Sequence, residues 1–220
     1  MNGSTRDRIF AGCGIGYVVG AFGGAMLAMG SGSTHSVTVG SSREAIASAV
    51  ASPAGTGIWV GAYMEMVAMA LFLAFGVWAA EKLGGGVLGS ALRATAGALT
   101  GASVVSLAVG DTLSYRAGHG IGLDAATTLV TLNEAIYVGT WFLMAAFLVV
   151  AGTMALGASR RVLGWSAFGV AAYLLVGAAV SFDDAGQFGV LLGMLWVVGA
   201  SIALARSRQP AALRTAIQNA

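Results

Sequence analysis

Two acidic side chains stand inside strongly apolar stretches of the sequence, where an ionised group is unfavourable. Glu65 lies in MEMVAMALFLAF (64–75) and Glu134 lies in NEAIYVGTWFLM (133–144). An ionised carboxylate in hydrocarbon costs at least a few kcal/mol, so each glutamate should face the interior of a helix bundle or water. Each lies about six to eight residues from the N-terminal end of its apolar stretch, roughly 9–12 Å along a helix. This similar depth predicts that the two carboxylates can share one site.

A pair of carboxylates at one site permits several kinds of chemistry. A proton- or cation-coupled carrier could alternate one of them between its protonated and ionised forms, and two facing carboxylates could share a proton. An intramembrane enzyme could use one as general acid and the other as general base. Alternatively, both are protonated and merely fasten the bundle through hydrogen bonds. Further polar residues are candidates for ligand or proton binding beside them: Asn133, Tyr63, Tyr137 and, at the mouth of the bundle, Asp111.

Few residues can hold a metal or a cofactor. His35 and His119 could complete an outward-facing carboxylate site, but they lack the spacing of a ligand pair on a helix, so a metal is the weak alternative. The sequence contains no Walker motif, nucleophile elbow or HExxH motif. Trp141 fits an interfacial or packing role. We therefore predict no cofactor, and the sequence identifies no catalytic residue.

Composition places the chain in a membrane. Of its 220 residues 57% are hydrophobic and 9% are charged, and the mean hydropathy is +0.84. Because an ordinary soluble domain carries about 25% charged residues, a soluble enzyme of this length is excluded. The apolar content also excludes a disordered chain, and a net charge of +2 gives no indication of nucleic-acid binding. A single cysteine excludes an intramolecular disulfide.

Six stretches approach the roughly 20 apolar residues that a membrane-spanning helix needs. They are 9–30, 57–80, 88–110, 128–156, 162–181 and 187–205. These stretches are apolar on all sides and about twice as long as the strands of a membrane barrel. The first follows Arg6 and Arg8 like a signal peptide, but its length favours a retained helix. We predict an all-α fold, a polytopic bundle of six transmembrane helices forming one membrane domain over 1–220.

Basic residues are sorted between the two ends of this bundle. Nine lie on one side: Arg6, Arg8, Lys82, Arg93, Arg160, Arg161, Arg206, Arg208 and Arg214. The other side has only Arg43 and Arg116. Because cytoplasmic loops are enriched in lysine and arginine, the first side is predicted to be cytoplasmic, with both termini inside.

Two outer loops follow from this topology. The longer, 31–56, contains SSREAIASAVASP, which predicts a short amphipathic helix at about 43–52, capped by Ser41 or Ser42. Its apolar residues Ile46 and Val50 could rest on the outer membrane face. The second outer loop, 111–127, is expected to be irregular, because it contains three glycines and several charges.

The first span carries a row of glycines at four-residue spacing: Gly12, Gly16, Gly20 and Gly24. This glycine zipper forms a smooth helix face that lets a second helix approach closely. The partner helix is expected within the same chain, and a dimer seam is the alternative.

Several segments resemble those of six-helix membrane proteins of actinobacterial type that carry a domain-of-unknown-function label. They are REAIASAVASPAGTGIWVGAY (43–63), EKLGGG (81–86), LNEAIYVGTWFLMAAFLVVAG (132–152) and RRVLGWSAFGVAAYLLVG (160–177). The resemblance is one of composition and layout over about 40–205. It implies the six-helix architecture and transfers no activity or site residue.

These observations predict a small multi-pass protein of the bacterial cytoplasmic membrane. We expect it to bind a small or lipidic ligand, or a partner membrane helix, in a bundle open to the outside. A carrier built on Glu65 and Glu134 is the alternative, and an intramembrane enzyme comes third. The expected partners are the lipid bilayer and a second copy or another membrane protein, with no nucleic acid.

Overall fold

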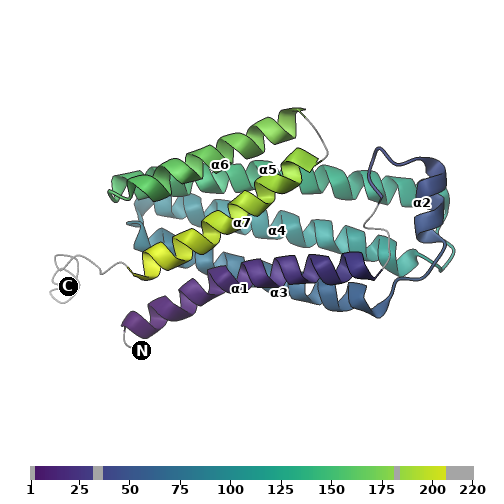
Figure 1. Cartoon of the computed structure of the whole chain (residues 1–220), viewed down its shortest axis with the longest axis horizontal. Helices are drawn as coiled ribbons and strands as arrows, with labels where there is room; N and C mark the ends of the chain where they lie inside the picture. Colours follow the sequence, from purple (N-terminus) through teal and green to yellow (C-terminus); the bar gives the residue numbers. More distant parts are fainter. Residues whose placement is uncertain (1–2, 32–36, 181–183, 207–220) are drawn as a thin grey trace.

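The computed structural model is all-helical over the residues that it describes, which are 3–31, 37–180 and 184–206 (Figure 1). The helices are α1 (Gly3–Gly30), α2 (Arg43–Val50), α3 (Thr56–Lys82), α4 (Gly86–Arg116), α5 (Leu123–Gly157), α6 (Arg161–Val180) and α7 (Asp184–Ala205). All except α2 are long and apolar enough to cross a membrane. The predicted helical membrane bundle with six spans is confirmed, and the chain is a multi-pass membrane protein.

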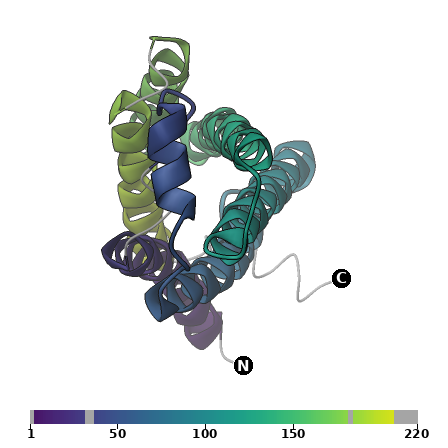
Figure 2. The same cartoon turned by 90° about the vertical axis from the view of Figure 1, so that its right-hand side faces the viewer.

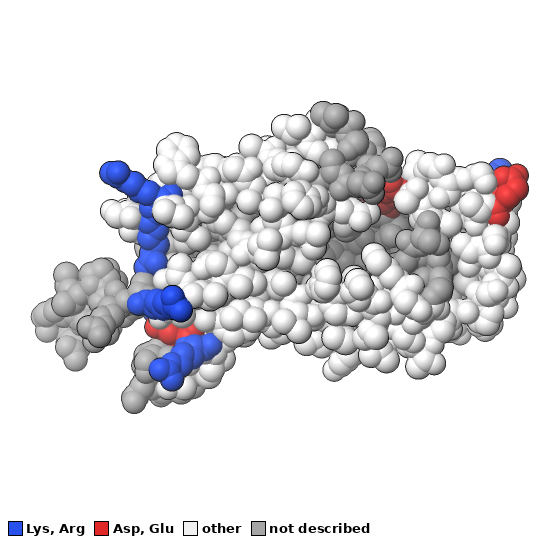
Figure 3. All heavy atoms as spheres, viewed as in Figure 1, with Lys and Arg blue, Asp and Glu red and all other residues white. Residues whose placement is uncertain are grey.

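Basic side chains gather at the end of the bundle where the first and last described helices have their free ends (Figure 3). We call this the inner end, after the predicted orientation, and the end that carries α2 the outer end. In Figure 1 the inner end is on the left and α2 is on the right.

The six long helices differ in length, and the difference lies at the outer end. The α4 and α5 helices have 31 and 35 residues, whereas α6 and α7 have 20 and 22. At 1.5 Å per residue, the first pair measures about 46 and 52 Å and the second about 30 and 33 Å. Figure 1 shows that α6 and α7 stop well short of the outer ends of α4 and α5. The outer half is therefore built from fewer helices than the inner half.

The extra length of α4 and α5 overturns the predicted irregular loop at 111–127. In the structure α4 continues to Arg116 and α5 begins at Leu123, so Asp111 is a helical residue. Threonines can continue these helices because their hydroxyls donate hydrogen bonds to backbone carbonyls one turn earlier. Thr127 Oγ1 donates to the carbonyl of Leu123 at 2.9 Å, and Thr128 Oγ1 donates to that of Asp124 at 2.8 Å.

The short helix α2 forms at the predicted place, but it packs on protein rather than on lipid. Ser42 caps it, accepting a hydrogen bond from the Ala45 backbone at 3.2 Å. The pKa of Glu44 is lowered by hydrogen bonds from its own backbone N–H and from Ser42. Ile46 and Val50 are buried against the outer ends of α4 and α5, with Leu113, Ala117, Ala126 and Val130. Because α4 and α5 extend beyond the other helices, their ends offer α2 an apolar surface.

An aromatic cluster fills the centre and inner half of the bundle. Phe72 and Phe147 are fully buried, with ring centroids 5.1 Å apart. Tyr17 of α1 lies 4.9 Å from Phe72, and Trp196 of α7 lies 6.3 Å from Phe147. These rings join α1, α3, α5 and α7 into one continuous core. These rings pack closely, so the bundle axis is filled by side chains here.

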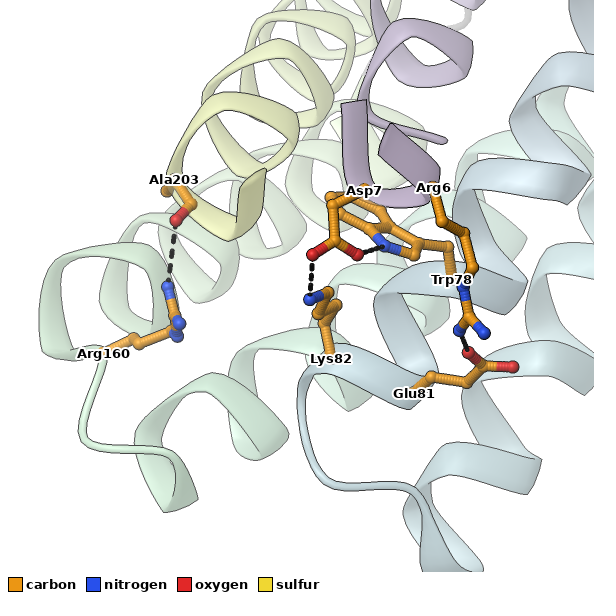
Figure 4. A network of polar contacts seen from close by, with 7 residues as sticks. All are labelled: Arg6, Asp7, Trp78, Glu81, Lys82, Arg160 and Ala203. Atoms are coloured by element: carbon orange, nitrogen blue, oxygen red, sulfur yellow. Dashed lines mark hydrogen bonds and ion pairs between the residues drawn. The ribbon is translucent and has the colours of Figure 1, made fainter. Parts of the chain in front are cut away.

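At the inner end a partly buried ion pair joins α1 to α3 (Figure 4). Lys82 Nζ donates to Asp7 Oδ2 at 2.6 Å, and the Trp78 indole donates to Asp7 Oδ1 at 3.2 Å. The Lys82 side chain is only 7% exposed and that of Asp7 only 20%. Beside it, Arg6 pairs with Glu81, and both of these side chains are substantially exposed.

The two ion pairs provide a matched test of burial. Asp7→Asn keeps an acceptor for Trp78 but leaves the nearly buried ammonium of Lys82 uncompensated, which should destabilise the protein by on the order of 2 kcal/mol. Arg6→Gln removes an exposed pair and should cost less than about 1 kcal/mol. Thermal unfolding in detergent measures both, and the double variant Asp7→Asn, Lys82→Met should recover part of the loss. Equal melting temperatures for Asp7→Asn and Arg6→Gln would contradict this role of burial.

Candidate functional site

A cavity of about 440 Å³ lies in the outer half of the bundle. Its walls come from α1, α3, α4 and α5, with contributions from residues 37–38 and from Gln187 near the start of α7. Viewed from the outer end, α2 lies in front of the bundle, on the opposite side from α4 and the outer part of α5 (Figure 2). The cavity exists where α6 and α7 are too short to complete the packing. It brings together four predicted site residues: Glu65, Asn133, Glu134 and Tyr137.

Glu65 enters this cavity from α3 because Gly24 of α1 has no side chain. A Cβ atom built at Gly24 would lie 2.7 Å from Glu65 Cγ and 2.7 Å from the Gly61 carbonyl oxygen. A Cβ atom at Gly61 would in turn lie 2.5 Å from the Gly24 carbonyl oxygen. The two helices therefore approach so closely here that both positions require glycine. The stem of Glu65 occupies the space that a side chain at position 24 would fill.

The glycine row lies mainly against α3. Gly16 and Gly20 face Leu71 and Ala68 respectively, with a Cβ atom 3.0 and 3.1 Å from the facing side chain. Gly12 differs, because a Cβ atom there would have no atom within 4 Å. The close approach thus becomes tighter toward Gly24 and Glu65, and the partner helix belongs to the same chain.

The Glu65 carboxylate is half-buried and accepts no hydrogen bond from any residue that the structure describes. Its charged neighbour is Asp111 of α4, which acts on it through space. The side chain of Tyr137 is also within electrostatic reach of Glu65. Among the described residues that line the cavity there is no lysine or arginine. The site therefore concentrates negative charge without a compensating cation.

One face of α5 supplies polar and aromatic groups at four-residue spacing. Asn133 accepts a hydrogen bond from the Ser106 hydroxyl at 2.8 Å through its amide oxygen. Tyr137 and Trp141 pack edge to face, with centroids 5.5 Å apart. Trp141 is only 1% exposed, and its indole nitrogen has no hydrogen-bond partner among the described residues. This nitrogen is enclosed by protein and its polar neighbour is the Tyr137 hydroxyl, so Trp141 offers the cavity an aromatic wall rather than a hydrogen-bond donor.

Glu134 has a different environment from Glu65, although both line the cavity. Its carboxylate accepts a hydrogen bond from the backbone N–H of Val39, in the segment that precedes α2. Glu134 thus ties the outer segment to α5. The acid that acts on Glu65 through space is Asp111.

Other predicted site residues lie elsewhere. Tyr63 does not line the cavity, and 71% of its surface is exposed on the outside of the bundle. His119 follows α4, stacks on Tyr115 at 5.7 Å and points Nδ1 at the carbonyl of Ala117. His35 falls outside the described residues. Within the part of the chain that the structure describes, no three metal-ligating side chains cluster.

The sequence analysis did not assign Ser106, Gln187 or Trp141 to the site. A signal for Trp141 was present, because Asn133, Tyr137 and Trp141 recur every fourth residue and so share one helix face. The contribution of Ser106 depends on how α4 packs against α5, which no local pattern indicates.

Comparison of the chain with protein-family models, with curated proteins and with solved structures finds no match. The function must therefore be argued from the cavity itself.

The contact between Gly24 and Glu65 predicts a large effect from one methyl group. Gly24→Ala should push α1 away from α3 and displace Glu65, with a loss of about 1–3 kcal/mol in stability from overpacking. Gly12→Ala is the matched control on the same helix, because its new methyl group meets open space. Thermal unfolding of the two variants in detergent measures the difference. If Gly24→Ala unfolds no earlier than Gly12→Ala, the close approach of the two helices is not as described.

Proposed function

We propose that this protein binds a small organic cation in the cavity of its outer half. The observation that carries the proposal is the Glu65 carboxylate, half-buried in that cavity without a basic partner or a hydrogen bond among the described residues. A carboxylate removed from water is stable only if it is protonated or paired with a cation. Asp111 and Glu134 add further acidic groups nearby, so a bound cation relieves the repulsion among them.

Aromatic walls favour an organic cation over a bare metal ion. Tyr137 and Trp141 line the cavity with Glu65, and aromatic faces attract ammonium groups within about 6 Å of the ring centroid. The metal-ligand cluster that an ion would need is missing from the described residues. A volume of about 440 Å³ suits a small molecule.

Hydrogen-bonding groups in the cavity further specify the ligand. The Asn133 amide retains its NH₂ group after its oxygen accepts the hydrogen bond from Ser106. This group is a donor, so the preferred ligand carries a hydrogen-bond acceptor, such as a hydroxyl or carbonyl oxygen, in addition to its positive charge.

The cavity supports binding from the outer side. It borders the outer segment at Val37 and Thr38, whereas the fully buried rings of Phe72 and Phe147 fill the bundle toward the inner end. A coupled carrier would have to open this aromatic packing in each cycle. We infer that the membrane is the bacterial cytoplasmic membrane, which the sorting of basic residues supports.

A charged probe and its uncharged analogue test the proposal. Choline has an ammonium group and a hydroxyl, and replacing its nitrogen by carbon removes the charge with little change of shape. A ligand at one hundred times its dissociation constant stabilises the folded state by about 2.7 kcal/mol. We expect choline, or benzyltrimethylammonium, to raise the melting temperature of the full chain in detergent, and the carbon analogue of choline to have no effect.

Substitutions test whether the ammonium probes bind in the outer cavity. Glu65→Gln should abolish the stabilisation by choline without lowering the melting temperature of the free protein, because a buried charge has been removed. Asn133→Ala removes the amide donor, so it should weaken choline more than benzyltrimethylammonium, which has no acceptor. Glu44→Gln, on the exposed α2, is the control. Equal stabilisation of the wild type and Glu65→Gln by every ammonium probe would refute the proposal.

The orientation is tested by cysteine labelling. In a Cys13→Ser background, His119→Cys at the outer end should react with an impermeant maleimide in intact cells. Ala158→Cys, in the turn between α5 and α6, should react only after the membrane is permeabilised. Both positions are exposed, so reactivity reports the side of the membrane. The opposite pattern would place the cavity on the cytoplasmic side.

A further inference from the structure

A second hollow lies at the inner end, far from the cation cavity. It is a groove of about 790 Å³ between α6 and α7. Its walls are mainly apolar, with Leu163 and Val170 on α6 and Leu192 and Leu195 on α7. The groove ends at Arg160 and Arg161, where α5 turns into α6.

Arg160 and Arg161 lie at this end of the groove without an acidic partner among the described residues. Arg160 Nη1 donates to the carbonyl of Ala203 in the last turn of α7 at 3.2 Å, which spans the gap between the helices (Figure 4). A guanidinium has five N–H donors, so others remain for a ligand. The described acids at the inner end, Asp7 and Glu81, are already paired with Lys82 and Arg6. Neither Arg160 nor Arg161 forms an ion pair among the described residues.

The backbone adds to the positive potential of the arginines. Arg160 is the cap of α6, because its carbonyl accepts from the Gly164 N–H at 3.0 Å. The preceding Ser159 has φ +60°, a left-handed conformation that closes the turn after α5 tightly. The first turn of α6 therefore presents free N–H groups beside two guanidinium groups, an arrangement that favours an anion.

The apolar part of the groove has the dimensions of one membrane leaflet. From Arg161 to Val170 the distance along α6 is about 14 Å at 1.5 Å per residue, close to half of the hydrocarbon thickness of about 30 Å. The rim is open to lipid, since Val162 is 87% exposed and Leu195 is 65% exposed. Trp196 is fixed in the wall by a hydrogen bond from its indole to the Leu163 carbonyl at 3.1 Å.

We propose that this groove is a binding site for one anionic phospholipid of the inner leaflet. Its phosphate is held by Arg160, Arg161 and the first turn of α6, and an acyl chain lies between α6 and α7. Basic pockets between transmembrane helices on the cytoplasmic side bind anionic headgroups in this way. The positive charges of the two arginines favour an anionic lipid in the groove over a zwitterionic lipid or an apolar partner helix.

Native mass spectrometry of the delipidated full chain tests this proposal. Phosphatidylglycerol and phosphatidylcholine with the same acyl chains are offered at equal concentration. We expect one retained phosphatidylglycerol per chain, and Arg161→Gln should lower its preference over phosphatidylcholine about fivefold. Arg93→Gln removes an exposed arginine of α4 that does not line the groove, so it should leave the preference unchanged.

Two glycine substitutions distinguish the contribution of the apolar groove to lipid binding from the contribution of the arginine charges. Gly199 lines the groove, and a Cβ atom there meets no atom within 4 Å, so Gly199→Leu should fill the groove without displacing protein atoms. It should abolish the one-to-one complex although both arginines remain. Gly169→Leu, at an equally open position of α6 outside the groove, should retain it.

Three results would overturn the proposal. Equal retention of the two lipids by the wild type would remove the role of the arginines. Wild-type binding by Gly199→Leu would place the lipid elsewhere. Displacement of phosphatidylglycerol by inorganic phosphate at the same concentration would show an anion site that has no acyl groove.

Discussion

The unequal length of the helices is the constraint on which this structure depends. Where all six long helices run side by side, their inward faces fill the bundle axis with aromatic rings. Toward the outer end α6 and α7 have already stopped, while α4 and α5 continue and gain α2 as a covering element. Fewer helices leave an interior that side chains do not fill, and the polar residues of α3, α4 and α5 collect there.

A second constraint, the close contact of α1 with α3, decides which polar group enters that space. At Gly24 and Gly61 the two backbones approach until no side chain fits, and the stem of Glu65 is confined beside Gly24. A side chain held in this way loses little further conformational freedom on meeting a ligand, which favours binding. The same helices are joined at the inner end by Asp7, Trp78 and Lys82, so the contact is fixed at both ends.

The sequence was sufficient to predict the six spans, because length and hydropathy act within each helix separately. It ended α4 too early, at 110, and began α5 too late, at 128. Hydropathy does not register threonines whose hydroxyls donate hydrogen bonds to the helix backbone. Glu65 and Glu134 were predicted at one depth, and both line the cavity. That Asp111 is the acid acting on Glu65, while Glu134 binds the Val39 N–H, depends on how neighbouring helices are rotated.

Charged residues that are paired within the chain can be distinguished from those that have no opposite charge among the described residues. Where two opposite charges are withdrawn from water inside the protein, as in Asp7 and Lys82, the chain supplies both partners. Glu65 in the outer cavity and the Arg160–Arg161 pair in the inner groove lack opposite charges from the described residues. A carboxylate withdrawn from water, such as that of Glu65, is unfavourable unless it is protonated or paired with a cation. A soluble cation can reach the outer cavity, and the lipid at the inner rim carries the phosphate that the arginines need. The same electrostatic requirement therefore underlies both proposals, a cation for the outer cavity and an anionic lipid for the inner groove.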